Sequence, residues 1–322
     1  MKLKSIMQLI KKDINIVDKI IIQHLNSDVQ MINQLSDYII TGGKKIRPIV
    51  TILVGRALDC SYNDKHIHYM SAIIEFIHIA TLLHDDVIDN STLRRGKKTA
   101  NNVFGNSAAI LVGDFIYTKS FQMLTELNSM PILQLMSNAT NIIAKGEILQ
   151  LINSGNPDIT ESIYMQIIYS KTARLFEAAT HAAAIICGAN EIQQQAMQTY
   201  GRYFGNAFQL MDDYMDYSMD NNKYNKNIGN DLITGKLTLP LLHVIENSSL
   251  EESKFIKNSI KNGNTKYLLN ELLLTMKRYG SLEYTNQRAQ EEAKKAIKAL
   301  DLLPSSLYKE ALVNLVLLCI KF

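Results

Sequence analysis

Two aspartate triplets with the same spacing hold the side chains best suited to metal and phosphate chemistry. They are Asp85, Asp86 and Asp89 in the first half of the chain, and Asp212, Asp213 and Asp216 in the second. In an α-helix, positions i and i+4 lie on one face, so the outer two carboxylates of each triplet point the same way. Mg²⁺ prefers a few carboxylate oxygens together with water and phosphate oxygens. The triplets therefore predict Mg²⁺ ions that clamp one diphosphate.

The sequence around each triplet favours this interpretation over a pair of solvated helix ends. Residues 72–87 and 204–217 are apolar stretches with helical spacing, and each ends on a triplet. Carboxylates clustered in such a setting repel one another and lose hydration unless cations compensate. We therefore expect metal binding at both triplets.

Two basic segments accompany the triplets. Residues 94–98 read Arg-Arg-Gly-Lys-Lys and follow the first triplet, while residues 42–48 read Gly-Gly-Lys-Lys-Ile-Arg-Pro and lead into an apolar helix expected over 49–58. Either segment alone is compatible with a solvated turn. Guanidinium groups bind phosphate oxygens in pairs, and the amides at a helix N-terminus attract anions. Beside the triplets, the two segments predict further walls of a diphosphate site.

The elements that must position these groups are helices. The chain has 322 residues, 47% of them hydrophobic, and only 5 prolines and 15 glycines interrupt it. Long stretches carry apolar residues at helical spacing, so we predict an all-α fold in one large domain over residues 1–322. The clearest break between helices is at 153–160, and residues 220–235 form a long polar loop.

Composition limits the classes of partner and location. The net charge of +3 is too small and too dispersed for a nucleic-acid partner. Cys60, Cys187 and Cys319 lie far apart, without the close pairing of a zinc site or a disulfide framework, which favours a reducing cytoplasm. The N-terminal residues lack the apolar run of a signal peptide. Segment 311–320 is apolar but shorter than the roughly 20 residues that span a bilayer, which indicates a core or dimer helix, with peripheral membrane contact as the alternative.

Six motifs, taken together and in this order, resemble those of the trans-prenyl diphosphate synthase family. They are Gly42-Gly43-Lys44-x-x-Arg47-Pro48, Leu82-Leu83-His84-Asp85-Asp86-x-x-Asp89, Arg94-Arg95-Gly96, Lys171-Thr172, Gln209-x-x-Asp212-Asp213-x-x-Asp216 and Gly235-Lys236-x-Thr238-Leu239-Pro240. The resemblance runs from about residue 20 to the end of the chain. Residues 75–78 and 111–117 are most similar to the bacterial octaprenyl-forming members, which supply the ubiquinone side chain.

The resemblance implies a large helical bundle of the isoprenoid synthase type, with a central substrate cavity, that acts as a homodimer. It implies an enzyme that condenses isopentenyl diphosphate repeatedly onto an allylic diphosphate. Farnesyl diphosphate is the expected starter, all-trans octaprenyl diphosphate the expected product and Mg²⁺ the implied cofactor. Products of farnesyl or geranylgeranyl length are the alternative within the family.

Roles for individual residues follow from the same resemblance. The six aspartates would bind the Mg²⁺ ions that hold the allylic diphosphate, and three cationic residues would assist them, namely Arg94, Lys171 and Lys236. Isopentenyl diphosphate would be bound by Lys44, Arg47, His78 and Arg95. Further substrate-binding candidates are Thr172, Gln209 and Lys226. The residues expected to act most directly in catalysis are Asp85, Asp89, Lys171, Gln209 and Asp212.

Product length is expected to depend on side chains beneath the first triplet. Ala80 and Thr81 precede Asp85 by five and four positions and are small, whereas bulk there is typical of family members that stop at short products. Close helix packing would require small residues equally. Phe121 and Met123 are candidates for the floor of a deeper tunnel. The chain departs from the family pattern in two places near Lys236, at Asn230, where aspartate is frequent, and at Leu237, where proline is usual.

Three other classes of protein share part of this pattern. A metal-dependent phosphohydrolase would pair His84 and Asp85 with His66, His68 or His78, but it leaves the second triplet unexplained. A non-catalytic subunit of a heteromeric synthase should have lost part of a triplet, and all six aspartates are present. A terpene cyclase has no use for a second diphosphate pocket at residues 42–48. A synthase is therefore the favoured function.

Overall fold

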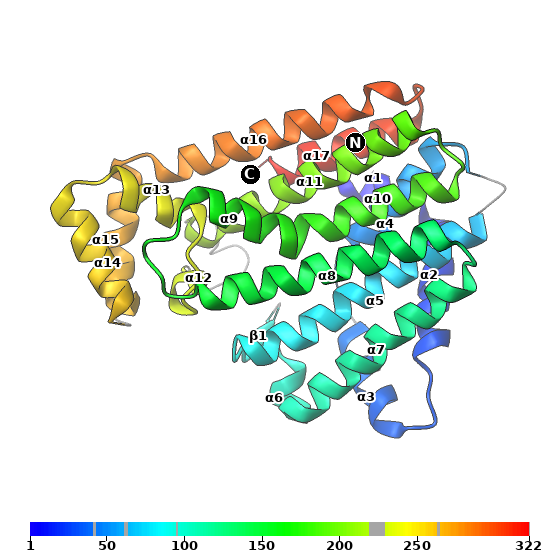
Figure 1. Ribbon diagram of the computed structural model, residues 1–322, viewed down its shortest axis with the longest axis horizontal. Coiled ribbons are helices and arrows are strands. Elements are labelled where there is room, and N and C mark those ends of the chain that lie inside the picture. Colours follow the sequence, from blue (N-terminus) through cyan, green and yellow to red (C-terminus); the bar gives the residue numbers. More distant parts are fainter. Residues whose placement is uncertain (41–42, 61–63, 95, 219–228, 263–264, 322) are drawn as a thin grey trace. The chain divides into compact units, whose positions relative to one another are not determined.

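The computed structural model describes residues 1–40, 43–60, 64–94, 96–218, 229–262 and 265–321 (Figure 1). These residues are almost entirely helical, which confirms the predicted all-α fold. Contacts divide the chain into two compact units. The first unit comprises Met1–Ala139, Leu175–Gly201 and Ala299–Leu315, and the second comprises Thr140–Arg174, Arg202–Lys298 and Val316–Phe322. A single domain over residues 1–322 stays a prediction.

The elements follow one another along the chain as a run of helices broken by one small hairpin, with a π-helix at η2 and a 3₁₀-helix at η4. They are α1 (Leu3–Leu9), α2 (Lys11–Leu25), α3 (Gln30–Ile40), α4 (Ile46–Ala57), α5 (Asp64–Ile88), β1 (Leu93–Arg94), β2 (Lys97–Lys98), α6 (Ala100–Phe104), α7 (Asn106–Glu126), α8 (Met130–Ile152), α9 (Glu161–Ile168), η2 (Tyr169–Ala173), α10 (Arg174–Ile186), α11 (Glu191–Tyr217), α12 (Asn230–Ile233), α13 (Leu239–Asn247), α14 (Leu250–Lys261), α15 (Thr265–Arg278), α16 (Ser281–Ala299), η4 (Leu300–Leu302) and α17 (Leu307–Cys319).

Helix α5 forms the centre of the first unit. It carries apolar side chains on nearly every face, and four successive large ones are fully buried, namely Ile73, Ile74, Phe76 and Ile77. A helix that is hydrophobic all round needs neighbours on all sides. Among the helices of the described residues, α5 is the one long and apolar enough to cross a membrane, but 72% of its most apolar window is buried, as in the core helix of a folded protein.

Helix α7 runs antiparallel to α5 (Figure 1). Near the start of α5, the Tyr69 hydroxyl donates to Glu126 Oε2 at the end of α7, at 2.8 Å. Near the end of α5, His84 Nε2 lies 3.2 Å from the carbonyl oxygen of Ile110 at the start of α7. Gly113 permits this approach, because a Cβ there would lie 2.5 Å from His84 Nε2. These two contacts fix which residue of α7 lies beside which residue of α5.

Helix α4 packs beside α10 at both of its ends. At the start of the two helices, the Arg47 guanidinium lies over the Phe176 ring, 4.4 Å from its centroid. At the other end, Cys187, just after α10, donates from Sγ to the carbonyl oxygen of Gly55 in the last turn of α4, at 3.8 Å. Contacts from start to start and from end to end mean that α4 and α10 run in the same direction.

A short antiparallel hairpin follows α5 where the sequence predicted only a basic loop. Leu93 pairs with Lys98 and Arg94 with Lys97. Gly96 has φ +76°, a conformation that glycine adopts readily in a tight turn. The Thr99 hydroxyl donates to the carbonyl of Ser91 at 2.6 Å and closes the base of the hairpin. The basic segment is therefore held in a fixed shape beside the end of α5.

The second unit has its own apolar core. Helices α9, α11 and α13 to α16 contribute buried side chains to it, among them Ile168, Leu210, Leu239, Ile256, Leu272 and Ala289. The predicted break at 153–160 separates α8 from α9. Gly146 of α8 allows close contact with the π-helix η2, because a Cβ there would lie 2.5 Å from Ser170 Cβ and 3.1 Å from the backbone nitrogen of Lys171. The core and this contact fix the backbone around Lys171.

Candidate active site

A cavity of about 320 Å³ lies beside the end of α5 in the first unit. Its walls come from α2, α3, the residues just before α4, α5, the hairpin and the start of α6. The histidine and the charged side chains that line it are Lys45, Glu75, His78, Asp86, Arg94, Lys97 and Lys98. Apolar side chains, including Ile79 and Leu82, form the rest of the wall. Four cationic side chains against two acidic ones favour an anionic ligand with an apolar part.

The first triplet spans the end of α5, with Asp85 and Asp86 in its last turn and Asp89 one residue beyond it, and its members differ in exposure. Asp86 is 2% exposed, and Arg94 donates to it from Nε at 3.0 and 3.1 Å and from Nη2 at 2.8 Å. Burial raises the pKa of Asp86, and the guanidinium of Arg94 opposes that rise. Asp85 and Asp89 are partly exposed, one helical turn apart, so both outer carboxylates are accessible on one face.

Arg47 brings an incompletely bonded guanidinium into the interior. Its Nη1 lies 3.2 Å from His78 Nε2, and since a guanidinium can only donate, this contact requires the His78 tautomer that carries its proton on Nδ1. Burial lowers the pKa of Arg47 to about 10, against the opposing charge of Glu75. Among the described residues, Arg47 Nε has no hydrogen-bond partner. A buried donor left without a partner is unusual, and an ordered water molecule or a ligand would satisfy it.

The other predicted residues of the two basic segments are Lys44 and Arg95. Lys44 is exposed. Its neighbour Lys45, which the sequence did not single out, has φ 47° and reaches back to an ion pair with Asp18. Arg95 lies outside the described residues. The structure thus brings Arg47, His78 and Arg94 into one region of the first unit.

The second triplet belongs to the end of α11 in the second unit. Asp212 is exposed, whereas Asp213 is 2% and Asp216 6% exposed. The Tyr164 hydroxyl donates to Asp213 Oδ2 at 2.5 Å, and Gln209 Nε2 donates to Oδ1 at 2.7 Å. Burial and the charge of Asp231 raise the pKa of Asp213 well above its usual value. Both oxygens of Asp213 are thus committed to protein donors.

Gln209 and Thr172, which the sequence predicted as substrate-binding residues, are joined directly. Thr172 Oγ1 donates to Gln209 Oε1 at 2.8 Å, so a hydrogen-bond chain runs from η2 through Gln209 to Asp213. Such a chain fixes the orientation of the amide, because its oxygen accepts and its nitrogen donates.

Asp216 stabilises the segment that leads to Lys236. Its Oδ2 accepts from the backbone N–H of Asp231 at 3.1 Å, in the first turn of α12, and its carbonyl accepts from Gly229 at 2.9 Å. The backbone N–H of Lys236 in turn donates to the carbonyl of Asp231 at 2.8 Å. A carboxylate at a helix N-terminus is favourably placed for the helix dipole. The adjoining residues 219–228, with Lys226, lie outside the described part.

Lys171 projects from the π-helix η2. Its Nζ donates to Glu147 Oε2 of α8 at 2.6 Å. Single π-helical turns are rare and often occur at functional sites. Glu147 and Tyr164 were both missed by sequence reasoning, because neither lies within a motif or near its partner in the chain.

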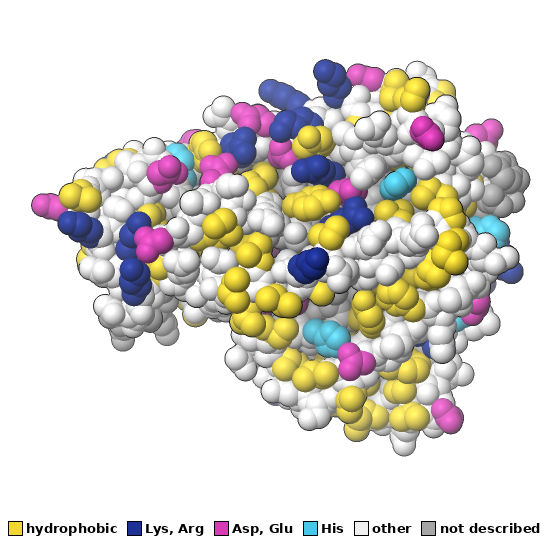
Figure 2. All heavy atoms as spheres, in the orientation of Figure 1, with side chains coloured by type: hydrophobic (Ala, Val, Ile, Leu, Met, Phe, Trp, Pro, Cys, Tyr) yellow, Lys and Arg dark blue, Asp and Glu magenta, His cyan; other side chains and the backbone are white. Residues whose placement is uncertain are grey.

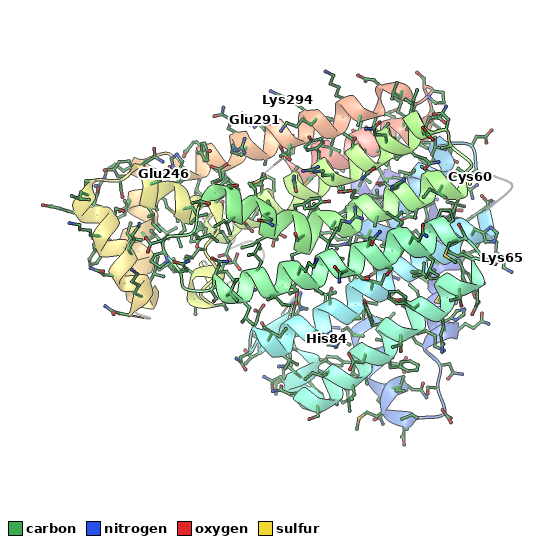
Figure 3. All side chains as sticks on the ribbon, in the orientation of Figure 1. Cys60, Lys65, His84, Glu246, Glu291 and Lys294 are labelled. Atoms are coloured by element: carbon green, nitrogen blue, oxygen red, sulfur yellow. The ribbon has the colours of Figure 1, made fainter. Side chains whose placement is uncertain are left out.

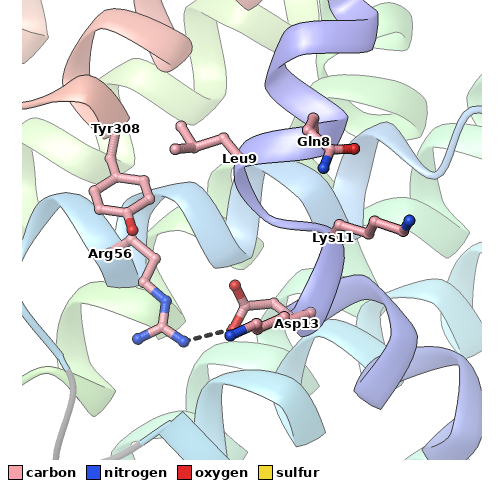
Figure 4. Close-up of a pocket in the computed structure, with 7 residues that line it drawn as sticks. Gln8, Leu9, Lys11, Asp13, Arg56 and Tyr308 are labelled. Atoms are coloured by element: carbon pink, nitrogen blue, oxygen red, sulfur yellow. Dashed lines mark hydrogen bonds and ion pairs between the residues drawn. The ribbon is translucent and has the colours of Figure 1, made fainter.

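A second cavity, of about 420 Å³, lies near the opposite end of α5 (Figure 4). Arg56 spans it, with Nη2 bonded to Asp13 and Nη1 bonded to Asp64, the first residue of α5. His68 Nε2 also donates to Asp13, at 2.8 Å. Because α5 rises about 1.5 Å per residue, this cluster is roughly 30 Å from Asp85 along the helix. Its charges already compensate one another, as in a structural ion-pair network.

His78 lines the same cavity as Asp86, but the other histidines that a phosphohydrolase would require have other neighbours. His68 bonds to Asp13, and His84 on α5 turns toward α7 (Figure 3), where it is 3.3 Å from Asp114 Oδ1. His66 is exposed. In the described part of the chain, no three His, Cys, Asp or Glu side chains form a ready-made metal site.

Comparison with known proteins assigns the class. The family model for polyprenyl synthetase matches residues 29–273, and the chain belongs to this family. It is 52% identical to the octaprenyl diphosphate synthase of Escherichia coli (strain K12) over 316 residues, which cover 98% of this chain and 97% of that protein. It is 46% identical to the octaprenyl diphosphate synthase of Haemophilus influenzae over 321 residues, covering 99% and 97%.

Comparison with solved structures leads to the same family. A polyprenyl synthase from Caulobacter crescentus CB15, solved in complex with calcium and isoprenyl diphosphate, superposes with a TM-score of 0.94 at 37% identity and covers 99% of this chain and 97% of its own. The resemblance inferred from the six motifs, and the helical isoprenoid synthase fold that it implied, are confirmed.

Proposed function

We propose that this protein is a trans-polyprenyl diphosphate synthase that adds isopentenyl diphosphate repeatedly to an allylic diphosphate and releases one pyrophosphate at each addition. The proposed starter is farnesyl diphosphate and the proposed product is all-trans octaprenyl diphosphate for a ubiquinone side chain. Family membership and the identity to two octaprenyl diphosphate synthases support this assignment.

The observation that carries the proposal is the contrast within the first triplet. Asp86 is buried and bound by Arg94, whereas Asp85 and Asp89 are partly exposed on one face of α5. Mg²⁺ is typically held by one or two carboxylates and completes its shell with water and substrate phosphate oxygens. The accessible pair of Asp85 and Asp89 fits that requirement, so Mg²⁺ binding does not need three protein ligands already in place. When bound, Mg²⁺ supplies the positive charge that neutralises a departing diphosphate.

The cavity in the first unit is the proposed site for isopentenyl diphosphate. His78 and the cationic side chains of the hairpin line the cavity and would bind the diphosphate, and Arg47, which contacts His78, is proposed to join them. Ile79 and Leu82 would contact the five-carbon chain. Lys44, which is exposed, and Arg95, which lies outside the described residues, are proposed as further diphosphate ligands. The fixed hairpin keeps these charges in place before the substrate arrives, which reduces the cost of ordering them.

The second unit is proposed to contribute the groups that act on the allylic diphosphate. Asp212 is the exposed member of its triplet and the proposed Mg²⁺ ligand, with Asp213 and Asp216 in supporting positions. Lys171, Lys226 and Lys236 would neutralise charge as the allylic carbon–oxygen bond breaks. Gln209, oriented by Thr172, would face the resulting carbocation or pyrophosphate. The isopentenyl double bond attacks the cation, and the pyrophosphate takes up the proton that is lost.

Product length is proposed to depend on residues along the α5–α7 pair. Ala80 is buried and Thr81 partly buried, one turn below Asp85. Tyr69 contacts Glu126 and His84 contacts Ile110, so Met123 is level with about residue 72 of α5. At 1.5 Å per residue that is roughly 20 Å below Asp85. Met123 is fully buried there and Phe121 partly so, which suits a floor for a long chain.

Oligomeric state and location complete the proposal. We propose a cytoplasmic homodimer, with peripheral membrane contact during product release. Figure 2 shows hydrophobic side chains exposed over α7, whose Leu111 is 66% exposed, and such a surface is available to a second copy.

The activity is tested by following two products in one reaction. Purified protein is incubated with Mg²⁺, labelled isopentenyl diphosphate and farnesyl diphosphate, and both released pyrophosphate and label in extractable lipid are measured. The proposal predicts one pyrophosphate for each isopentenyl unit incorporated, and neither product after chelation of the metal. Inorganic phosphate without incorporation would instead identify a phosphohydrolase.

A further inference from the structure

Cys60 and Cys187 lie against each other although they are far apart in the sequence. The carbonyl of Gly55 accepts from the backbone N–H of Cys60 at 3.0 Å and from Cys187 Sγ at 3.8 Å. The two thiols also share a side-chain hydrogen bond. The spacing of the cysteines in the sequence did not indicate this contact, which arises because the parallel packing of α4 and α10 brings the ends of both helices together.

The two sulfurs are chemically unequal. The hydrogen bond from Cys187 lowers the pKa of Cys60, burial opposes that effect, and the guanidinium of Arg56 adds to it while Asp59 and Asp64 act against it. The same hydrogen bond and burial raise the pKa of Cys187. When Cys60 loses its proton, the Cys187 S–H can turn from the Gly55 carbonyl to the Cys60 thiolate. Cys60 is thus the better nucleophile, with Cys187 in position to resolve it.

We propose that Cys60 and Cys187 form a redox-reactive pair that a small hydroperoxide converts into a reversible disulfide between the ends of α4 and α10. The Cys60 thiolate attacks hydrogen peroxide, so that a sulfur–oxygen bond forms, the oxygen–oxygen bond breaks and water leaves after protonation. Cys187 then attacks the Cys60 sulfur, which forms the disulfide and expels a second water. Two thiols and one peroxide give one disulfide and two waters.

Burial sets the class of oxidant. Cys60 is 2% and Cys187 9% exposed, so reagents with aromatic or peptide bulk are excluded while a peroxide can enter during local opening. The third cysteine, Cys319, is more exposed and belongs to the second unit. It provides an internal reference for reactivity that does not depend on the pair.

The proposed disulfide ties together the helix pair that holds Arg47. The Arg47–Phe176 contact joins the starts of α4 and α10, and the disulfide would join their ends. A cross-link between residues so far apart in the sequence restricts the unfolded chain, so the oxidised protein should resist heat better than the reduced one. Reduction by a thiol would restore the original stability.

The test compares the wild-type protein with Cys319→Ser, which keeps the pair, and with Cys187→Ser and Cys60→Ala, which each remove one member. Reduced samples are treated with hydrogen peroxide, unfolded, alkylated and analysed by intact mass and non-reducing peptide mapping. A parallel sample receives a bulky aromatic disulfide reagent in place of peroxide.

The proposal predicts a Cys60–Cys187 linked peptide, a mass lower by two hydrogen atoms and a higher melting temperature in wild-type protein and Cys319→Ser. All three signatures should be absent from the other two variants and reversed by dithiothreitol. The bulky reagent should modify Cys319 first. Peroxide that oxidises Cys319 while Cys60 and Cys187 stay fully alkylatable would overturn the proposal, as would a linked peptide that contains Cys319 in place of either partner. Should Cys187→Ser fail to fold, Cys60→Ala and Cys319→Ser alone distinguish these outcomes.

Discussion

Arg94 holds Asp86 through both carboxylate oxygens, with Nε 3.0 and 3.1 Å from Oδ1 and Oδ2 and Nη2 2.8 Å from Oδ1. The pair joins strand β1 to the last turns of α5. The hairpin that carries the basic segment is therefore tied to the helix that carries Asp85 and Asp89. A change at Arg94 should affect the acidic and the basic side of the proposed site together.

Replacing Arg94 with methionine tests this connection. The variant leaves the buried Asp86 carboxylate without its cation and releases the end of α5. Loss of a partner that orients metal ligands typically costs about 10–100-fold in metal affinity or activity. We expect a comparable fall in elongation rate and a higher Mg²⁺ concentration at half-maximal rate. Arg278→Met is the matched control, because Arg278 forms an exposed ion pair with Glu252. Equal behaviour of the two variants would contradict a role for Arg94.

Tyr164→Phe tests whether Asp213 is a positioning residue. The substitution removes the donor to Asp213 Oδ2 and leaves a buried carboxylate oxygen without that partner. A buried polar group left unpaired costs about 1–3 kcal/mol, so chemical denaturation should show a loss of that size. The Mg²⁺ dependence should change less than in Asp212→Asn. Tyr308→Phe, at a partly exposed tyrosine of α17 in the first unit, should be neutral. A larger Mg²⁺ effect in Tyr164→Phe than in Asp212→Asn would contradict this role.

The hydrogen bonds of Asp13 should make part of the protein's stability depend on pH in the acid range. Burial raises the pKa of Asp13, but hydrogen bonds from His68 and Arg56 outweigh it and hold the pKa below its usual value. The unfolded-state pKa of aspartate is about 3.9, so this stabilisation is complete above roughly pH 4 and is lost as pH falls through the lower folded-state pKa. Asp13→Asn should therefore lower the melting temperature at pH 7.

The size of the stability loss in Asp13→Asn, and its dependence on pH, separate an effect of charge from an effect of packing. Breaking a buried ion pair costs about 3 kcal/mol, and the difference between Asp13→Asn and wild type should shrink only in melts taken below about pH 4. Asp158→Asn, at an exposed ion pair with Lys257, should change little at any pH. A constant difference across the pH range would show that Asp13 acts through packing alone.

Met123→Ala tests the floor of the proposed tunnel. The substitution removes a fully buried side chain about 20 Å below Asp85. It should extend the product distribution by at least one isoprene unit, measured by chromatography of the dephosphorylated products. It should also cost about 2–5 kcal/mol of stability, as large-to-small core substitutions do. Met130→Ala, at a 62% exposed position, should leave both unchanged. Unaltered product lengths would remove Met123 from this role.

The helices and the two triplets could be predicted because their signals are local. Apolar spacing determined α5 and α11, and the repeated aspartate pattern located the acidic groups at the ends of both helices. The unequal exposure of Asp85 and Asp86 could not be predicted in the same way, because it depends on Arg94 folding back in a hairpin. The sequence around the triplet indicated only a basic loop.

The other contacts that the sequence did not predict join residues that lie far apart in the chain. Tyr164 bonds Asp213 and Glu147 bonds Lys171 across the packing of separate helices, and neither residue belongs to a recognisable motif. The contact between Cys60 and Cys187 likewise arises from the parallel arrangement of α4 and α10, which no spacing within either helix reveals. Contacts of this type require the tertiary structure.

The account is tested most directly by the length of the lipid that the purified protein makes. With Mg²⁺, labelled isopentenyl diphosphate and farnesyl diphosphate, chromatography of the dephosphorylated products should show all-trans prenyl alcohols that accumulate at eight isoprene units. Substitution of Asp85 by asparagine should abolish them. Label that stays in isopentenyl diphosphate, or farnesol as the sole lipid product, would contradict the proposed function.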